Sequence, residues 1–134
     1  MIDVLKKGIY TKLNTTSAVT TLLSSATAIH YTQAKAGSPL PYIIFTFAGG
    51  SDDGDTLLDS ADFMYYIKGV ANTAQEAGQI AAAIRDALHN QTFNLDDGWS
   101  VYHCQQKELI SQVENVDRSQ YHHRGASYRI RISQ

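Results

Sequence analysis

Acidic residues are concentrated in one short stretch of the sequence. Residues 49–62, GGSDDGDTLLDSAD, hold five aspartates around Gly54, a density typical of calcium-binding loops. The stretch lacks the ligand register and the twelfth-position glutamate of an EF-hand, so we predict no metal site. We interpret it as a hairpin loop that is solvated, or that faces a pore or a partner in an assembly. The aspartates are Asp52, Asp53, Asp55, Asp59 and Asp62.

Histidine and cysteine residues are the second set of candidate ligands. His122 and His123 are adjacent, as are His103 and Cys104. Adjacent residues on a strand point to opposite faces of a sheet, so neither pair binds one metal ion without a bulge. The sequence also lacks HxH, HxxxH and CxxC spacings. We therefore predict partly exposed strand histidines and no zinc site.

Nucleophilic catalysis would require an activated cysteine or serine. No helix start or flanking basic residue is present to lower the pKa of the single thiol, Cys104. No serine lies in a GxSxG or SxxK spacing, and Gly49-Gly50 is not followed by the lysine of a phosphate loop. We predict Cys104 to be a small core residue, and we predict neither a catalytic residue nor a cofactor.

A helix over residues 73–90 is the element around which the rest is expected to pack. Thr73 and Glu76 have the spacing of a capping box. Apolar residues then recur at intervals of three and four, which is typical of a helix that covers an apolar surface. These residues are Ala77, Ile80, Ala81, Ile84 and Leu88.

Two more helices are predicted near the start of the chain. Asp3 is expected to cap the first, which ends near Asn14 and buries a stripe formed by Ile2, Leu5, Ile9 and Leu13. Thr16 or Ser17 is expected to cap a shorter second helix.

Aromatic and β-branched runs predict the strands. Gln33–Pro41, Phe93–Gly98 and the polar segment Ser111–Ser119 separate them as loops or turns. The predicted strands are Ile29–Tyr31, Tyr42–Phe47, Ala61–Val70, Trp99–Ile110 and Tyr121–Ile132.

In the last strand, alternation places Arg129 and Arg131 outward and Tyr128, Ile130 and Ile132 inward, with a possible bulge at Gly125-Ala126. The element order α-α-β-β-β-α-β-β predicts an α+β fold with a mostly antiparallel sheet covered by helices.

The composition limits the class of protein. A length of 134 residues suits one domain over residues 1–134. The net charge of -2 argues against general binding of polyanions. No apolar run reaches the roughly 20 residues that span a bilayer, and no signal peptide is apparent, so we expect a soluble protein.

Four features in order carry a resemblance to a known family. They are the apolar helix stripe at the start and the segments LPYIIFTF, YIKGVANTAQEAGQIAAAIRDAL and SYRIRIS. Together they resemble the tail-terminator, or tail-to-head joining (tail completion), proteins of long-tailed bacteriophages. In that family a proline-tyrosine strand follows a helix pair, and the later helix ends near an alanine-leucine pair; here these are Pro41-Tyr42 and Ala87-Leu88.

The resemblance implies a virion protein without enzymatic activity, made in the host bacterial cytoplasm. Such a protein forms a ring, expected to be hexameric, on the head-proximal end of the tail tube. There it ends tube polymerisation and joins the tail to the head. Its implied partners are copies of itself, the tail tube protein and the head connector or stopper; phage DNA passes through without specific binding, and no membrane is involved.

Two hypotheses concern residues within that picture. The Asp52–Asp62 loop faces the lumen or an axial partner, where carboxylates would keep DNA from adhering to the wall. Arg129 and Arg131 contact a neighbouring subunit or the connector, because outward arginines suit recognition of carboxylates.

Other functions remain open from the sequence. Within structural proteins, the alternatives are a head-completion stopper and a minor tail protein. From a different class, a small enzyme or ligand-binding domain would use His103, Cys104 or the aspartates. An RNA-binding sheet would need stacking aromatics such as Tyr42, Tyr65 and Tyr66 beside basic residues, whereas the adjoining loop is acidic.

Overall fold

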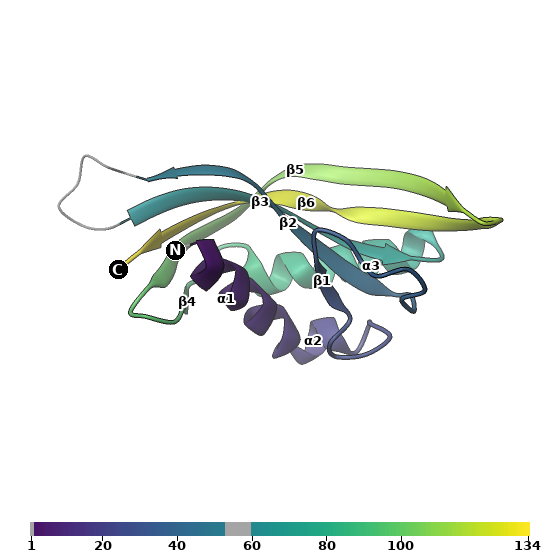
Figure 1. The fold of residues 1–134 in the computed structure, drawn as a ribbon, viewed down its shortest axis with the longest axis horizontal. Helices are drawn as coiled ribbons and strands as arrows, with labels where there is room; N and C mark the ends of the chain where they lie inside the picture. Colours follow the sequence, from purple (N-terminus) through teal and green to yellow (C-terminus); the bar gives the residue numbers. More distant parts are fainter. Residues whose placement is uncertain (1, 53–59) are drawn as a thin grey trace.

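The computed structural model describes residues 2–52 and 60–134, which form one six-stranded sheet with helices on one face (Figure 1). The predicted α+β class and the order of the predicted elements are confirmed; a short strand, β4, also forms within the expected turn Phe93–Gly98. The elements are α1 Ile2–Asn14, α2 Ser17–Thr20, β1 Ile29–Tyr31, β2 Tyr42–Asp52, β3 Ser60–Ala71, α3 Ala74–Leu88, β4 Phe93–Asn94, β5 Ser100–Val116 and β6 Ser119–Ser133.

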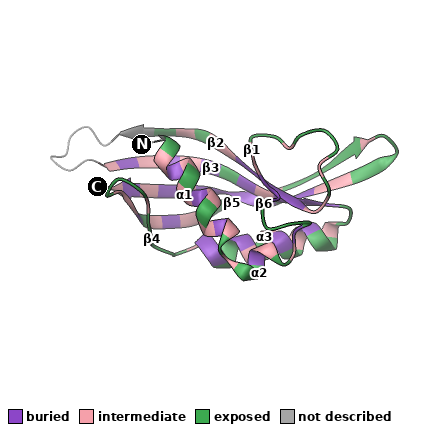
Figure 2. Cartoon of the chain, turned by 60° about the horizontal axis from the view of Figure 1, so that its bottom comes forward, coloured by how far each residue is buried: buried purple, intermediate pink, exposed green. Residues whose placement is uncertain are grey.

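The strands lie in the order β1-β2-β3-β6-β5-β4. β1 runs parallel to β2, and the other neighbouring strands are antiparallel. Residues alternate between a face covered by helices and an open face, as Figure 2 shows along β3. The side chains on the covered face form the core, where Phe45, Tyr65 and Tyr128 of three adjacent strands are at most 2% exposed.

Helix α3 is specified by its cap and by its buried stripe. The Glu76 N–H donates to Thr73 Oγ1 at 3.2 Å, which confirms the predicted cap. The buried residues are those predicted except that Ala87 takes the place of Ala81. A Cβ added at Gly69 of β3 would collide with Ile80, so this glycine lets α3 lie close to the sheet.

Helix starts differ slightly from expectation at the first two helices. α1 begins at Ile2, so Asp3 lies inside the first turn and is not a cap. In the first turn, its carboxylate still interacts favourably with the positive end of the helix dipole. Thr16 is the N-cap residue of α2, but its hydroxyl donates to the Lys12 carbonyl at 2.6 Å and caps no N–H of α2.

The long polar loop predicted over residues 49–62 is shorter than expected. β2 continues through Asp52 and pairs with Ala61 of β3, after a register shift between Phe47 and Gly49. Glycine and polar residues extend a strand here because the backbone pairs with a neighbour, which the side chains do not indicate. Residues 53–59 lie outside the described residues.

The largest error of sequence interpretation concerns Ser111–Ser119. This segment belongs to a hairpin in which β5 runs to Val116 and β6 starts at Ser119. Asp117 and Arg118 have φ values of 45° and 71°, as a two-residue hairpin turn requires. The tip of the hairpin lies beyond α3 (Figure 1), so no core lies beneath it to impose an apolar pattern.

The irregularities that bend the last hairpin lie in β5. The bulge predicted at Gly125-Ala126 of β6 is wrong, because β6 pairs continuously with β3 and the shifts occur in β5 at Val101/His103 and Gln106/Leu109. A Cβ on Gly125 would overlap the Ile67 carbonyl and the backbone of Lys68. The absence of a side chain at Gly125 therefore allows β6 to lie close to β3.

Candidate functional site

A charged cluster lies on the open face of the sheet, at the end where β2 and β3 reach residues 53–59. The β3–β6 register sets Asp62 opposite Arg131 and Met64 opposite Arg129. The Arg129 Nε donates to both Asp62 carboxylate oxygens, at 3.1 and 3.0 Å, and its Nη2 donates to Oδ2 at 2.5 Å. The Arg131 Nε lies 3.8 Å from the same Oδ2, which is an ion-pair distance.

The electrostatics of this cluster favour the ionised carboxylate. Hydrogen bonding from Arg129 lowers the pKa of Asp62, and the charges of Arg129 and Arg131 add to that effect. The Asp62 side chain is 21% exposed, whereas those of Arg129 and Arg131 are 40% and 36% exposed. The guanidinium groups therefore present a partly accessible surface.

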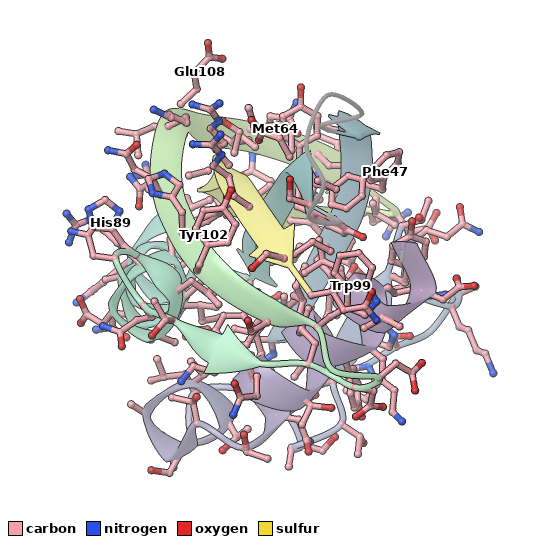
Figure 3. All side chains as sticks on the ribbon, turned by 90° about the vertical axis from the view of Figure 1, so that its left-hand side faces the viewer. Phe47, Met64, His89, Trp99, Tyr102 and Glu108 are labelled. Carbon is pink, nitrogen blue, oxygen red and sulfur yellow. The ribbon has the colours of Figure 1, made fainter. Side chains whose placement is uncertain are left out.

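Strand β5 completes the surroundings of the cluster. Because of its first register shift, both Tyr102 and His103 lie next to Arg131. The Arg131 guanidinium carbon lies 5.8 Å from the centre of the Tyr102 ring, within cation–π range. Figure 3 shows Tyr102 on β5 and Met64 on β3 from this end of the molecule.

The structure thus joins two sets of residues that sequence interpretation kept separate. Asp62, predicted as part of an acidic loop, is a paired residue of β3, and Arg129 and Arg131, predicted to face outward, are its partners. Asp52 is the last residue of β2. Asp53, Asp55 and Asp59 lie outside the described residues.

A groove of about 360 Å³ lies further along the open face, between β2 and the bent β5. Its floor is low because β6 contributes Gly125 and Ser127 opposite Lys68 and Tyr66. Burial lowers the pKa of Lys68. The groove combines an apolar wall with hydroxyl, amide and ammonium groups, which suits binding. Side chains that line it include Ile44, Thr46, Tyr66, Lys68, Ile110 and Gln112.

Next to the groove lies a buried histidine. His123 is 7% exposed, and its Nε2 lies 3.3 Å from the Glu114 Oε1 on β5. Burial, assisted by the nearby charge of Lys68, lowers its pKa. His122 is only partly buried and lies on the opposite face, as adjacent strand residues must.

Cys104 is a core residue, as predicted. It is 1% exposed, and burial raises the pKa of its thiol to about 12. A thiol in that state is a poor nucleophile. In the described part of the chain, no group of three or more histidine, cysteine, aspartate or glutamate side chains is placed to hold a metal ion.

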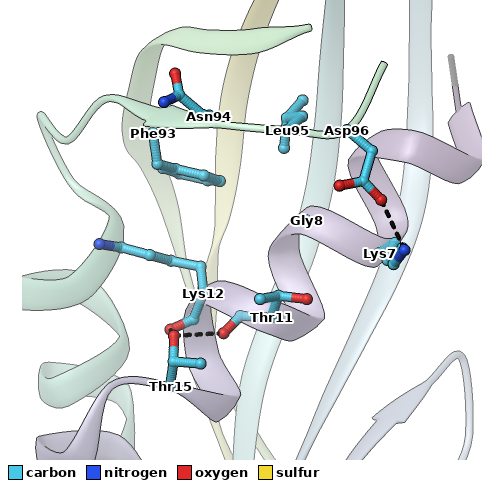
Figure 4. A pocket seen from close by; sticks show the side chains of 9 residues that line it. All are labelled: Lys7, Gly8, Thr11, Lys12, Thr15, Phe93, Asn94, Leu95 and Asp96. Atoms are coloured by element: carbon cyan, nitrogen blue, oxygen red, sulfur yellow. Dashed lines mark hydrogen bonds and ion pairs between the residues drawn. The ribbon is translucent and has the colours of Figure 1, made fainter. Parts of the chain in front are cut away.

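A second hollow, of about 230 Å³, lies between α1 and the segment of β4 (Figure 4). The Lys7 Nζ bonds Asp96 Oδ2 at 2.6 Å across its rim. The Lys12 Nζ lies 5.6 Å from the centre of the Phe93 ring. Both charges of the Lys7–Asp96 pair are well exposed, so the pair is a surface contact.

Sequence interpretation missed the groove on the open face and the long hairpin that forms one of its walls. Both depend on bends in β5, where Ser127 Oγ accepts the Glu108 N–H at 3.0 Å and His89 Nδ1 accepts the Gln106 N–H at 3.0 Å. Neither contact has a local sequence signal, because the partners are far apart along the chain. None of the helices in the described ranges is long and apolar enough to span a membrane.

Comparison with known proteins places the chain in a family. No curated protein matches it in sequence, whereas 17 chains of solved structures match it in fold. One of these comes from the "Virion of native gene transfer agent (GTA) particle", with a TM-score of 0.71 and 19% identity over 99% of this chain and 97% of that chain. Residues 7–133 match the family described as "Tail completion protein gp17". The chain therefore belongs to the tail completion protein gp17 family.

Proposed function

We propose that this protein is a structural component of a phage-type virion that completes the tail. In this proposal it forms a hexameric ring on the head-proximal end of the tail tube, ends tube polymerisation and joins the tail to the head connector. The family match over residues 7–133 is the observation that carries the proposal. The resemblance seen in the sequence supports the ring, its position and its partners.

The arrangement of side chains also favours a binding role. Cys104 is buried with a raised pKa, and His123 is buried against Glu114, so neither offers a reactive group to a substrate. The groove on the open face and the hollow between α1 and β4 are both lined by mixed polar and apolar side chains. Such surfaces suit protein partners, namely other copies of the chain, the tail tube protein and a connector or stopper protein.

The acidic segment fits this proposal as a wall that repels DNA. We propose that the Asp52–Asp62 segment faces the lumen or an axial partner, so that DNA passes without binding. The Asp62 charge is offset by Arg129 and Arg131, so the remaining aspartates must carry the repulsion. Replacing Asp52, Asp53, Asp55 and Asp59 by asparagine should impair DNA passage or head attachment while the fold persists; unchanged infectivity would count against this role.

The two arginines have different roles in this proposal. The Nε and Nη2 of Arg129 are engaged with Asp62, so Arg129 acts mainly by holding the cluster. Arg131, at an ion-pair distance from Asp62, is the better candidate for a subunit or connector contact. If Arg131→Glu chains assembled and joined heads normally, the proposed contact of Arg131 would be wrong.

The test is electron microscopy of particles produced by the parent phage without this gene product. Overlong or irregular tails beside separate filled heads are the expected result, and supplying the wild-type chain in trans should restore joined particles. Tails of normal length beside leaking heads would instead indicate a stopper. Normal infectious particles would contradict a role in tail completion and favour a ligand-binding or enzymatic function.

A further inference from the structure

One edge of the sheet is left open along the distal half of β5. Nearer the body, the Cys104 carbonyl accepts the Asn90 N–H at 2.8 Å, and the Gln106 N–H is bonded to His89, so the end of α3 covers the edge there. From Lys107 to Val116, β5 pairs with β6 on one side and with no other strand of the described residues. We name Lys107–Val116 the docking segment. An unpaired strand of this length is a ready site for association with another chain.

The docking segment also exposes two large apolar side chains. Leu109 is 79% exposed and Val113 is 56% exposed. They pair with Ala126 and His122 of β6, whose partners in β3 are the core residues Ile67 and Ala71. Leu109 and Val113 therefore point to the helix-covered side of the sheet, and their exposure shows that the described residues of the helices leave them largely uncovered.

A matching cleft lies on the same side of the sheet at its opposite edge. It has a volume of about 340 Å³ and lies between α1 and the edge strand β1, with Phe45 of β2 behind it. Its apolar lining comes from Tyr10, Ile29, Tyr31 and Phe45, and Asp3, Lys6 and Lys7 line its rim. The Lys6 Nζ lies 4.2 Å from the centre of the Tyr31 ring. We name this hollow the α1–β1 cleft.

The two features have the relation that a head-to-tail ring requires. A cyclic assembly repeats a heterologous contact between two different surfaces, and these surfaces must lie on opposite sides of the subunit. The docking segment and the α1–β1 cleft lie at the β5 and β1 edges of one sheet and on the same side of it. In a ring they would meet once per subunit.

The two surfaces also lie at the same level across the sheet. Leu109 pairs with Ala126, which pairs with Ile67 of β3. Ile67 pairs with Phe45, and Phe45 pairs with Tyr31, both of which line the cleft's side of the sheet. The docking segment of one copy therefore needs no large shift along the strands to reach the cleft of the next.

We propose that the docking segment of one copy binds the α1–β1 cleft of the next copy, with Leu109 entering the cleft and Val113 lying along β1. Four residues of strand separate the two side chains by about 13 Å, so only one of them enters. The contact rests on the proposed ring and specifies its subunit interface. The occupant of the cleft is a second copy of this chain.

Site-directed cross-linking tests the contact within assembled tails. Chains that carry Leu109→Cys are mixed with chains that carry Lys6→Cys, supplied to tails lacking the wild-type product, and treated with a short bifunctional maleimide. The native Cys104 remains in place because it is buried. A linked pair of the two chains is expected, and it should be absent when Gln75→Cys, on an exposed position of α3, replaces Lys6→Cys.

A second measurement compares two variants at exposed positions. Leu109→Ser should weaken ring assembly about tenfold, whereas Gln75→Ser, on α3, should assemble like the wild type. Because both side chains are exposed in the single subunit, circular dichroism should show both variants folded.

The outcomes separate this inference from the proposed function. Rings at the tube end that lack the cross-link, or that tolerate Leu109→Ser, would overturn the contact and leave the ring intact. A link from Leu109→Cys to a tail tube protein would also overturn it. Failure of the wild-type chain to reach the tube end would overturn both proposals.

Discussion

Asp62 is the acceptor that holds two arginines on the open face of the sheet. An Asp62→Asn chain loses the negative charge between Arg129 and Arg131 and keeps only a neutral acceptor. We expect the free energy of unfolding to fall by about 1 kcal/mol, because charged hydrogen bonds contribute more than this but both arginines are more than a third exposed. Urea titration at neutral pH measures the change.

The same pair gives stability a defined dependence on pH. The pKa of Asp62 is lower in the folded chain than in the unfolded one, so its contribution is complete above the ordinary value of about 4 and is lost as the pH falls through the folded pKa. The difference between wild type and Asp62→Asn should therefore shrink below about pH 4. Asp96→Asn, which breaks the exposed pair with Lys7, is the control with little expected effect. A difference that stays constant with pH would contradict the assignment.

Cys104 gives a second test at the scale of one residue. Its thiol is buried and its pKa is raised to about 12, so at pH 8 it should not react with Ellman's reagent in the folded chain. In urea the thiol should regain its ordinary pKa and react with a stoichiometry of one per chain. Rapid reaction without denaturant would show that β5 does not bury this residue.

At the scale of elements, the bend in β5 depends on a hydroxyl of the neighbouring strand. Ser127 is 4% exposed, and its Oγ accepts the Glu108 N–H that the register shift leaves without a ladder partner. Ser127→Ala should lower the free energy of unfolding by about 1 kcal/mol, since it leaves that N–H unsatisfied in a partly buried place. Ser111→Ala, at an exposed position of β5, should change it little. Equal urea midpoints for the two variants would contradict a stabilising role of the hydrogen bond between the Glu108 N–H and Ser127 Oγ.

Elements whose signals are local were predictable from the sequence. Thr73 and the apolar stripe from Ala77 to Leu88 specify α3 within one stretch, and the prediction is confirmed. The distal half of β5 was not predictable, because Ser111–Val116 is held by backbone pairing with β6 and has almost no buried side chain. Apolar alternation in a sequence arises because one face of a strand is buried. A strand that extends beyond the core therefore lacks the alternation from which it could be predicted.

The candidate site followed the same rule. Residue type and position in the sequence indicate Asp62, Arg129 and Arg131 one by one. Their pairing, however, depends on a contact between Asp62 and Arg129, which are 67 positions apart in the chain. Only the β3–β6 register, which the sheet as a whole determines, brings them together. The groove beside them was missed because it arises from small residues in one strand and bends in another.

At the scale of the whole molecule, stability should be uneven. The centres of β3 and β6 are buried and paired on both sides, whereas the docking segment is paired on one side and exposed. In hydrogen exchange, we expect the amides of Tyr65 and Ile67 to exchange only by global unfolding and the outward amides of Lys107–Val116 to exchange first. These outward amides should become protected in assembled rings. Equal protection of both groups in the isolated chain would contradict this picture.

The tight turn at Asp117 and Arg118 has a consequence for the order of folding. It joins β5 and β6 through two residues, so this hairpin can close alone on the scale of about 1–10 μs. Pairing of β6 with β3 must first close a loop that includes α3, at a larger cost in chain entropy. We expect the hairpin to form first and to serve as the template on which β3 and the helices assemble. The segment that we propose to join neighbouring copies would then exist before the subunit core that it extends from.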